Sequence, residues 1–217
     1  MSPDSRKIRL IMDLRRAGVR DLKVLQVMER LPREAFAPDG FRDQAYEDTA
    51  LPISCHQTMT APIAVGLMTQ ALRLGERMRV MEVGTGTGYH TAVLSRLCRR
   101  VYTLERHREL LLEAERRFAS LALNNITTRA ADGTLGWREQ APFERIIVTA
   151  AAKDVPPLLA EQLAEGGLMI VPVDQGPGEQ RLLRVLRTAS GLETEDLGEM
   201  RFVPLVAEPA RRWDWVG

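Results

Sequence analysis

The chain has 217 residues, of which 45% are hydrophobic, so it can form one domain with its own core, or one domain plus an extension, but not two full-sized modules. Lys and Arg number 30 and Asp and Glu number 29, and the net charge of +1 gives no basic excess of the kind that drives sequence-independent binding to nucleic acid or anionic membranes. Two cysteines are too few for a disulfide framework, and the three histidines lack metal-ligand spacing, which argues against a structural zinc site.

The start of the chain carries charged side chains among its apolar residues. The charged positions nearest the start are Asp4, Arg6, Lys7 and Arg9. They leave no uninterrupted apolar stretch of the kind found in a signal peptide. No later run approaches the roughly 18 apolar residues of a membrane-spanning helix. We therefore expect a protein of the reducing cytoplasm, without a membrane partner.

The first third of the chain is predicted to contain helices and one long loop. Two short amphipathic helices are expected between Ser2 and Leu31, with a break near Gly18. The apolar face of the second helix consists of Val24, Leu25, Met28 and Leu31. Phe36–Gln57 has no sustained period and is predicted to be a long irregular connection, which in compact domains is often a binding loop. A further helix is expected over Pro62–Leu74, closed by the glycine that follows.

The middle of the chain alternates short apolar runs with amphipathic stretches in the order β-α-β-α-β-β-α-β. Strands are predicted at Met78–Val83, Val101–Leu104, Ile126–Arg129, Phe143–Thr149 and Leu168–Val173, and helices at Tyr89–Leu97, His107–Ala122 and Pro156–Leu163. This order is typical of an α/β fold with a mostly parallel, doubly wound sheet. Two longer strand-like segments, Arg181–Thr188 and Leu197–Val206, are joined through Ser190 and Gly191, and we expect them to form an antiparallel addition at the sheet edge.

The sharpest feature is a glycine-rich turn directly after the predicted strand that ends at Val83. The turn reads Gly84-Thr85-Gly86-Thr87-Gly88 and leads into a helix. Such a turn favours glycine because it needs unusual backbone angles and because the backbone must approach a ligand closely. Glu105 follows Gly84 by 21 residues, at the end of the next strand, a spacing that places a carboxylate on ribose hydroxyls. Together they predict an adenosine-containing cofactor at the switch point of the sheet.

The details of the turn indicate which cofactor is bound. A dinucleotide site has the pattern Gly-x-Gly-x-x-Gly, whereas here the third glycine comes one residue early. Glu82 stands just before the turn, where a negative charge would oppose a pyrophosphate and suit a cationic ligand. S-adenosylmethionine carries a sulfonium and an ammonium group and no phosphate, so the segment favours a methyltransferase over an NAD enzyme.

A third element is the tripeptide Ala131-Asp132-Gly133, which follows the strand predicted at Ile126–Arg129. Asp132 could accept a hydrogen bond from the adenine amino group, or it could simply form an Asx-type turn. The residues alone leave both interpretations open, and the two cofactor signals at the same sheet edge favour the first.

At these residues the chain resembles the protein-L-isoaspartate O-methyltransferase family. The resemblance covers the glycine turn and the segments Leu31–Phe36, Ala45–Asp48, Leu51–Ile53, Gln57–Pro62, Asp132–Trp137, Ala141–Ala152 and Arg201–Leu205. It implies a Rossmann-like methyltransferase fold with an N-terminal helical extension. It further implies that S-adenosylmethionine donates a methyl group to the α-carboxylate of L-isoaspartyl residues in damaged proteins, which starts their repair. The extension would comprise residues 1–61 and the methyltransferase domain residues 62–217, in one compact unit.

The resemblance also assigns the site residues. The cofactor would contact Thr58, Met59, Gly84, Thr85, Gly86, Gly88, Glu105, Ala131 and Asp132. Thr60 takes the place of a functional hydroxyl residue that is usually Ser in the family. An isoaspartyl carboxylate is already ionised near neutral pH, so no general base and no metal is required, and Thr60 would orient the carboxylate by a hydrogen bond. The chain departs from the family at Ser54, Cys55 and His56, where glycines are common.

The expected partners are isoaspartyl peptides and proteins, with no nucleic acid. One alternative keeps the fold and S-adenosylmethionine but places the methyl group on RNA or a small molecule. The near-neutral charge of the chain argues against RNA as the acceptor. A second alternative is a binding module without turnover, against which the intact turn and Glu105 argue.

Several further residues have two possible interpretations. Phe202–Leu205 could lie along a peptide substrate or form an ordinary core strand. We expect Cys55 and His56 to pack within their loop, and His90 and His107 to be surface residues or contacts at the cofactor edge. The tail 211–217 is basic and aromatic and could be a frayed terminus or a partner contact.

Overall fold

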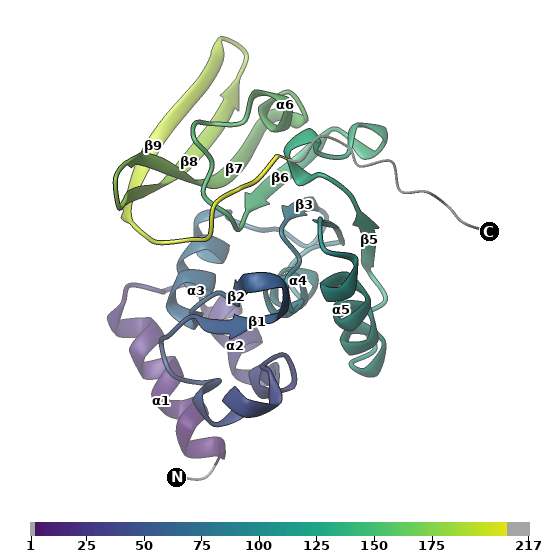
Figure 1. Cartoon of the computed structure of the whole chain (residues 1–217). Helices are drawn as coiled ribbons and strands as arrows, with labels where there is room; N and C mark the ends of the chain where they lie inside the picture. Colours follow the sequence, from purple (N-terminus) through teal and green to yellow (C-terminus); the bar gives the residue numbers. More distant parts are fainter. Residues whose placement is uncertain (1–2, 208–217) are drawn as a thin grey trace, which may run out of the picture.

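A seven-stranded sheet forms the centre of the computed structural model, which describes residues 3–207 (Figure 1). Its strand order is β5-β4-β3-β6-β7-β8-β9. The strands are β3 (Arg79–Val83), β4 (Arg100–Glu105), β5 (Ile126–Ala130), β6 (Phe143–Val148), β7 (Leu163–Gly176), β8 (Glu179–Thr188) and β9 (Gly191–Glu199). Strands β3 to β7 are parallel, and β7, β8 and β9 pair antiparallel. The mostly parallel α/β sheet with an antiparallel edge is thus confirmed.

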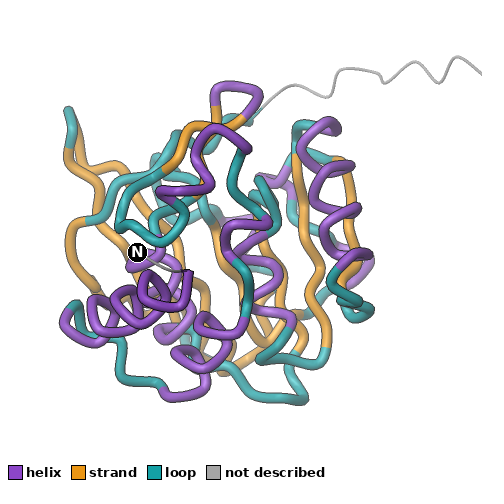
Figure 2. The backbone as a smooth tube through the Cα atoms, turned by 90° about the horizontal axis from the view of Figure 1, so that it is seen from below, coloured by secondary structure: helices purple, strands orange, loops and turns teal. Residues whose placement is uncertain are grey.

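The central strands are buried on both faces, which explains their near-continuous apolar sequences. In β3 the side chain of Val80 packs with α3 (Pro62–Ala71) and α4 (Tyr89–Ser95) on one face. Its neighbour Met81 packs with α6 (Pro157–Ala160) on the other, as the alternation of a strand requires. Helix α5 (Arg108–Ser120) packs beside α4, and the helices flanking the sheet can be followed in Figure 2.

The N-terminal helices α1 (Pro3–Arg16) and α2 (Leu22–Arg30) form as predicted, separated by Gly18 at φ +101°. Asp21 begins α2, because its Oδ1 accepts hydrogen bonds from the amides of Lys23 and Val24. The predicted apolar face of α2 is buried, in one cluster with residues of α1, α4 and α5. The extension and the rest of the chain therefore share a core.

The connection Phe36–Gln57 contains more regular structure than its sequence indicates. It includes the 3₁₀ turn η2 (Asp39–Gln44) and the first strand of a short hairpin, β1 (Leu51–Ile53) with β2 (Gln57–Met59). Strands of three residues are too short to show an alternating pattern, so the prediction missed them.

The predicted strand Leu197–Val206 is wrong. The last strand, β9, begins directly after a two-residue turn and ends at Glu199. It is an edge strand rich in exposed acidic residues, several paired with arginines of β8, and such strands lack the apolar alternation on which the prediction relied. The apolar residues that follow leave the sheet and run back toward β6, drawn in yellow in Figure 1.

Helix α6 is also shorter than the predicted Pro156–Leu163, because β7 begins at Leu163. Within residues 3–207, no helix combines the length and apolar character needed to cross a membrane. The basic and aromatic tail 211–217 lies outside the described residues.

Candidate active site

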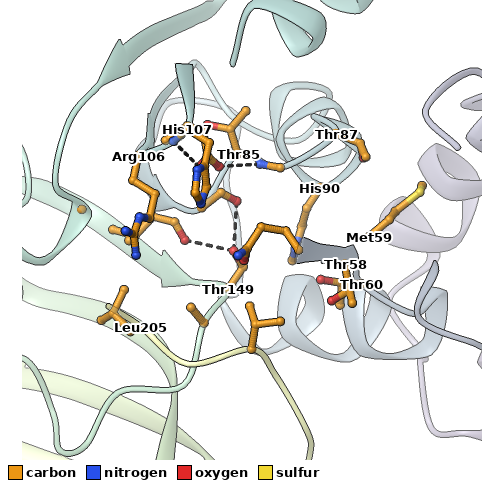
Figure 3. A pocket seen from close by; sticks show the side chains of 18 of the residues that line it. Thr58, Met59, Thr60, Thr85, Thr87, His90, Arg106, His107, Thr149 and Leu205 are labelled. Carbon is orange, nitrogen blue, oxygen red and sulfur yellow. Dashed lines mark hydrogen bonds between the residues drawn. The ribbon is translucent and has the colours of Figure 1, made fainter. Parts of the chain in front are cut away.

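A cleft opens at the carboxyl ends of β3 and β4, beside the point where the strand order reverses (Figure 3). Its lining comes from Gln57–Thr60, the glycine turn, Glu105–His107, Thr149 with the alanine that follows, and Val203–Val206. This is where open α/β sheets bind ligands. The structure therefore brings the predicted cofactor turn, ribose acid and hydroxyl residue to one cavity.

The glycine turn has three positive φ angles, and two of its glycines are fixed by packing. A Cβ atom on Gly84 would lie 2.2 Å from Oγ1 of Thr149, and one on Gly88 would lie 2.6 Å from the ring of Phe118. Gly86, at φ +52°, would have its Cβ in nearly open space. Thr149, which the sequence analysis did not single out, also donates a hydrogen bond to the carbonyl of Gly84 at 2.9 Å. The turn is thus held rigidly against the cleft.

Glu105 ties the turn to the end of β4. Its Oε2 accepts a hydrogen bond from the amide of Gly86 and its Oε1 accepts one from the amide of His107, both at 2.9 Å. A carboxylate has about four acceptor positions, so two remain for a diol. This arrangement is suited to ribose hydroxyls, and the ribose contact itself stays a prediction.

The turn after β5 lies at the margin of the cleft. Gly133 lines the cavity, whereas Ala131 and Asp132 do not. Oδ1 of Asp132 accepts hydrogen bonds from the amide and the hydroxyl of Thr134, at 2.9 and 2.7 Å. An Asx-type turn is therefore present, and a contact between the second carboxylate oxygen and adenine stays a prediction.

Glu82 does not have the role inferred from its position. It is fully buried and does not line the cleft. Its Oε2 accepts hydrogen bonds from the hydroxyls of Thr91 and Thr103. Burial raises the pKa of Glu82 to about 8, more than the two hydroxyls lower it. Because the carboxyl is buried away from the cleft and burial favours its neutral form, the argument that its charge selects a cationic ligand is wrong.

Thr58, Met59 and Thr60 follow one another along the cleft wall at the end of β2 (Figure 3). Met59 anchors the segment, since its side chain is buried in the core that contains α1 and α2. The hydroxyl of Thr60 has no hydrogen-bond partner among residues 3–207, so it is available to a ligand.

The guanidinium of Arg33 binds the backbone of this segment, a role that the sequence analysis did not assign to it. Its guanidinium is fully buried, with Nε donating to the carbonyl of Ala45 and Nη2 to that of Thr60, both at 2.7 Å. It also lies 4.5 Å from the ring centroid of Tyr89. No carboxylate in the described residues forms an ion pair with it. A sequence pattern does not predict a buried arginine, because its burial depends on carbonyls distant in the chain.

Three histidines line the cleft, and one of the two interpretations given for His90 is excluded. His90 is only 6% exposed and lines the cleft, so the surface interpretation is wrong for this residue. His56 and His107 line the cleft as well. Cys55 lies outside the lining, and burial followed by the charge of Glu109 raises the pKa of its thiol, which makes it a poor nucleophile.

Val203–Val206 is an extended segment at the cleft, not a core strand. The amide of Ala151 donates to the carbonyl of Val203 at 2.8 Å, and the amide of Leu205 donates to the carbonyl of Ala151 at 2.7 Å. In the described part of the chain, no group of three or more His, Cys, Asp or Glu side chains is arranged to hold a metal ion.

The sequence comparisons with known proteins all point to one family of methyltransferases. The sequence model of the family described as "Protein-L-isoaspartate(D-aspartate) O-methyltransferase (PCMT)" matches residues 5–210. The protein-L-isoaspartate O-methyltransferase of Rhodospirillum centenum is 59% identical over 97% of this chain and 96% of its own length. That of Rhodospirillum rubrum is 60% identical over 95% of each chain.

Solved structures are similar over nearly the whole chain. One protein-L-isoaspartate O-methyltransferase superposes with a TM-score of 0.84 at 28% identity, covering 93% of this chain and 66% of that one. A Plasmodium falciparum protein described as a member of the same enzyme class, solved with S-adenosyl-L-homocysteine, gives 0.80 at 25% identity, covering 91% and 97%.

Proposed function

The chain belongs to the protein-L-isoaspartate O-methyltransferase family, and from this premise we propose that its cleft holds S-adenosylmethionine along the glycine turn while Thr60 orients the accepting carboxylate. The activity is transfer of a methyl group from S-adenosylmethionine to the α-carboxylate of L-isoaspartyl residues in damaged proteins, the first step of their repair.

The residues present fit the cofactor. Gly86 lines the cleft without a side chain, so a ligand can approach its backbone, and the two free acceptor positions of Glu105 are suited to the ribose diol. The turn at Asp132 lies one residue from the cleft lining, where its second carboxylate oxygen would accept from the adenine amino group. S-adenosylmethionine supplies an electrophilic methyl group on a sulfonium.

The chain has to align the reactants and does not have to move a proton. An isoaspartyl α-carboxylate has a pKa near 3.5, so it is ionised at neutral pH. Holding oxygen, methyl carbon and sulfur in line can contribute about 7 to 11 kcal/mol. The hydroxyl of Thr60, which is free among the described residues, donates a hydrogen bond to one carboxylate oxygen and leaves the other to react.

Arg33 serves this alignment through the backbone. Because its guanidinium binds the carbonyls of Ala45 and Thr60, it fixes the loop that carries the hydroxyl. Its buried positive charge also favours an anionic substrate in the cleft nearby.

The peptide chain of the substrate is assigned to the segment Val203–Val206. Alternate residues of an extended chain direct their backbone groups to opposite sides. Val203 and Leu205 bind Ala151, so the carbonyl of Pro204 and the amide of Val206 point away from it. A flexible peptide can pair with these groups while its isoaspartyl carboxylate enters the cleft.

Two further proposals concern the setting of the protein. Cys55 and Cys98 are both free thiols, as in proteins of reducing compartments, which supports a location in the cytoplasm.

The chain is divided by function into an extension, residues 1–61, and a methyltransferase domain, residues 62–217, since the first part supplies Thr60 and the second the glycine turn.

The observation that carries the proposal is that Glu105, the glycine turn and Thr60 all line one cleft. Calorimetry of the full chain with S-adenosyl-L-homocysteine and with NAD⁺ tests it, followed by a crystal structure of the complex. We expect binding of the first compound only, with its ribose hydroxyls on Glu105. Binding of NAD⁺ instead, or a nucleoside bound away from Glu105, would overturn the proposal.

A further inference from the structure

A chain of two hydrogen bonds, from the ring of His90 to Thr69 and from Thr69 to the backbone of α3, indicates which tautomer the ring adopts. Nε2 of His90 lies 2.9 Å from Oγ1 of Thr69, and that hydroxyl donates its hydrogen to the carbonyl of Val65 at 2.7 Å. A hydroxyl has a single hydrogen, so in the arrangement that also satisfies the carbonyl of Val65, Thr69 accepts from His90. The hydrogen of the neutral ring is therefore on Nε2, and Nδ1 carries a lone pair.

This lone pair has no partner in the described structure. Nδ1 of His90 is buried and forms no hydrogen bond among residues 3–207, although such an orphaned acceptor is costly. The ring nevertheless lines the cleft (Figure 3). Burial, and then the charge of Arg33, lower the pKa of His90 to about 3, so the ring stays neutral and Nδ1 stays an acceptor. A donor group of a ligand bound in the cleft would satisfy this acceptor.

The position of the ring indicates which donor this is. Glu105 marks the ribose end of the cleft and Thr60 the end where the methyl group is accepted. His90 comes from the start of α4, directly after the glycine turn, and lines the cleft together with Thr60 and Val65. The methionyl arm of the cofactor must extend past the sulfur in this direction. Its carboxylate only accepts hydrogen bonds, so its ammonium is its one donor group.

Carboxylate partners for the ammonium are scarce among the described residues that line the cleft. Glu105 is the only carboxylate among the described lining residues, and it is engaged at the ribose end. We propose that Nδ1 of His90 accepts a hydrogen bond from the methionyl ammonium of S-adenosylmethionine, and that Thr69 acts as a positioning residue by fixing the tautomer. This inference rests on the proposed function and gives a role to a residue that the family resemblance did not assign to the site.

The test compares two ligands that differ only in this group. S-adenosyl-L-homocysteine has the ammonium, and its desamino analogue has hydrogen in its place. In His90→Gln, the amide can still bind Thr69 but Nδ1 is lost. We expect its calorimetric affinity for S-adenosyl-L-homocysteine to fall about tenfold, and that for the desamino analogue to change by less than about twofold.

Thr69 provides a matched pair of variants. Thr69→Val removes the acceptor that fixes the tautomer and should also weaken S-adenosyl-L-homocysteine selectively, whereas Thr69→Ser keeps the hydroxyl and should restore the affinity. A merely structural role would weaken both ligands alike.

Spectra of the wild-type chain with ¹⁵N-labelled histidine provide a measurement that needs no variant. They should place the hydrogen of His90 on Nε2 and show Nδ1 shifting with S-adenosyl-L-homocysteine but not with the desamino analogue. Equal losses for both ligands, no loss for either, or a hydrogen on Nδ1 would overturn the inference. A wild-type chain that binds neither ligand would instead contradict the proposed function.

Discussion

Arg33 donates a hydrogen bond from Nη2 to the backbone carbonyl of Thr60 at 2.7 Å, across 27 positions of the sequence. The residue assigned to orient the substrate is therefore held by a buried cation of the N-terminal extension. The extension contributes both the hydroxyl and its support, and the sheet contributes the cofactor turn. Substitutions at Thr60, Arg33 and Glu105 separate these contributions.

Thr60→Val should lower kcat/KM for an isoaspartyl peptide by about tenfold or more, because a hydrogen bond to a charged carboxylate is lost. Thr60→Ser keeps the hydroxyl and should retain most of the activity. Steady-state methyl transfer with both variants, alongside calorimetry with S-adenosyl-L-homocysteine, checks this. Full activity of Thr60→Val would remove the assigned role.

Arg33→Lys keeps the charge but cannot bind the carbonyls of Ala45 and Thr60 in the same fork geometry. We expect kcat to fall by about tenfold while the affinity for S-adenosyl-L-homocysteine stays within about twofold, since the glycine turn is untouched. Assays well below the measured melting temperature separate this effect from lost stability. An unchanged kcat in a folded variant would show that Arg33 does not position Thr60.

Glu105→Gln should weaken S-adenosyl-L-homocysteine by about tenfold, because an amide nitrogen cannot accept from a loop amide or a ribose hydroxyl. The desamino analogue should lose affinity to the same extent, unlike in His90→Gln, because both ligands share the ribose. Calorimetry of both ligands provides the comparison, and unchanged affinity would contradict the ribose assignment.

Glu82→Gln should change how the stability of the protein depends on pH. The pKa of Glu82 is raised from 4.5 to about 8, so the folded state holds an extra proton between these values. The stability this gives is fully present below about pH 4.5 and is lost as the pH rises through 8. Glu82→Gln has no proton to lose, so the wild type should lose stability relative to the variant between about pH 4.5 and 8, at up to about 1.4 kcal/mol per pH unit.

Denaturant unfolding of both proteins across this range measures the difference. Parallel curves for wild type and Glu82→Gln would mean that the carboxyl of Glu82 ionises as readily in the folded state as in the unfolded state.

The sequence predicts the parts of the site that depend on local pattern. The glycine turn is encoded within five residues, and the distance from Gly84 to Glu105 is set by one helix and one strand, so their meeting could be expected. The buried polar groups of Glu82, Arg33 and His90 bind partners 9 to 27 positions away in the sequence: Thr91 and Thr103, the carbonyls of Ala45 and Thr60, and Thr69, respectively. Their protonation and partners could not be read from neighbouring residues.

The edge of the sheet was mispredicted for a related reason. Most side chains of β9 are exposed, so its sequence shows acidic pairing with β8 and no apolar alternation. The apolar run Phe202–Leu205 resembles a strand, yet among the described residues its backbone pairs only with the backbone of Ala151 and the side chain of Gln180.

Methyl transfer to a matched pair of peptides distinguishes repair of isoaspartyl residues from methylation of other acceptors. One peptide contains an L-isoaspartyl residue, the other contains L-aspartate at the same position, and bulk RNA serves as a third acceptor. With S-adenosylmethionine labelled on its methyl group, the account predicts a base-labile methyl ester on the isoaspartyl peptide, with neither of the others labelled. Equal labelling of both peptides, or labelling of RNA with neither peptide modified, would contradict it.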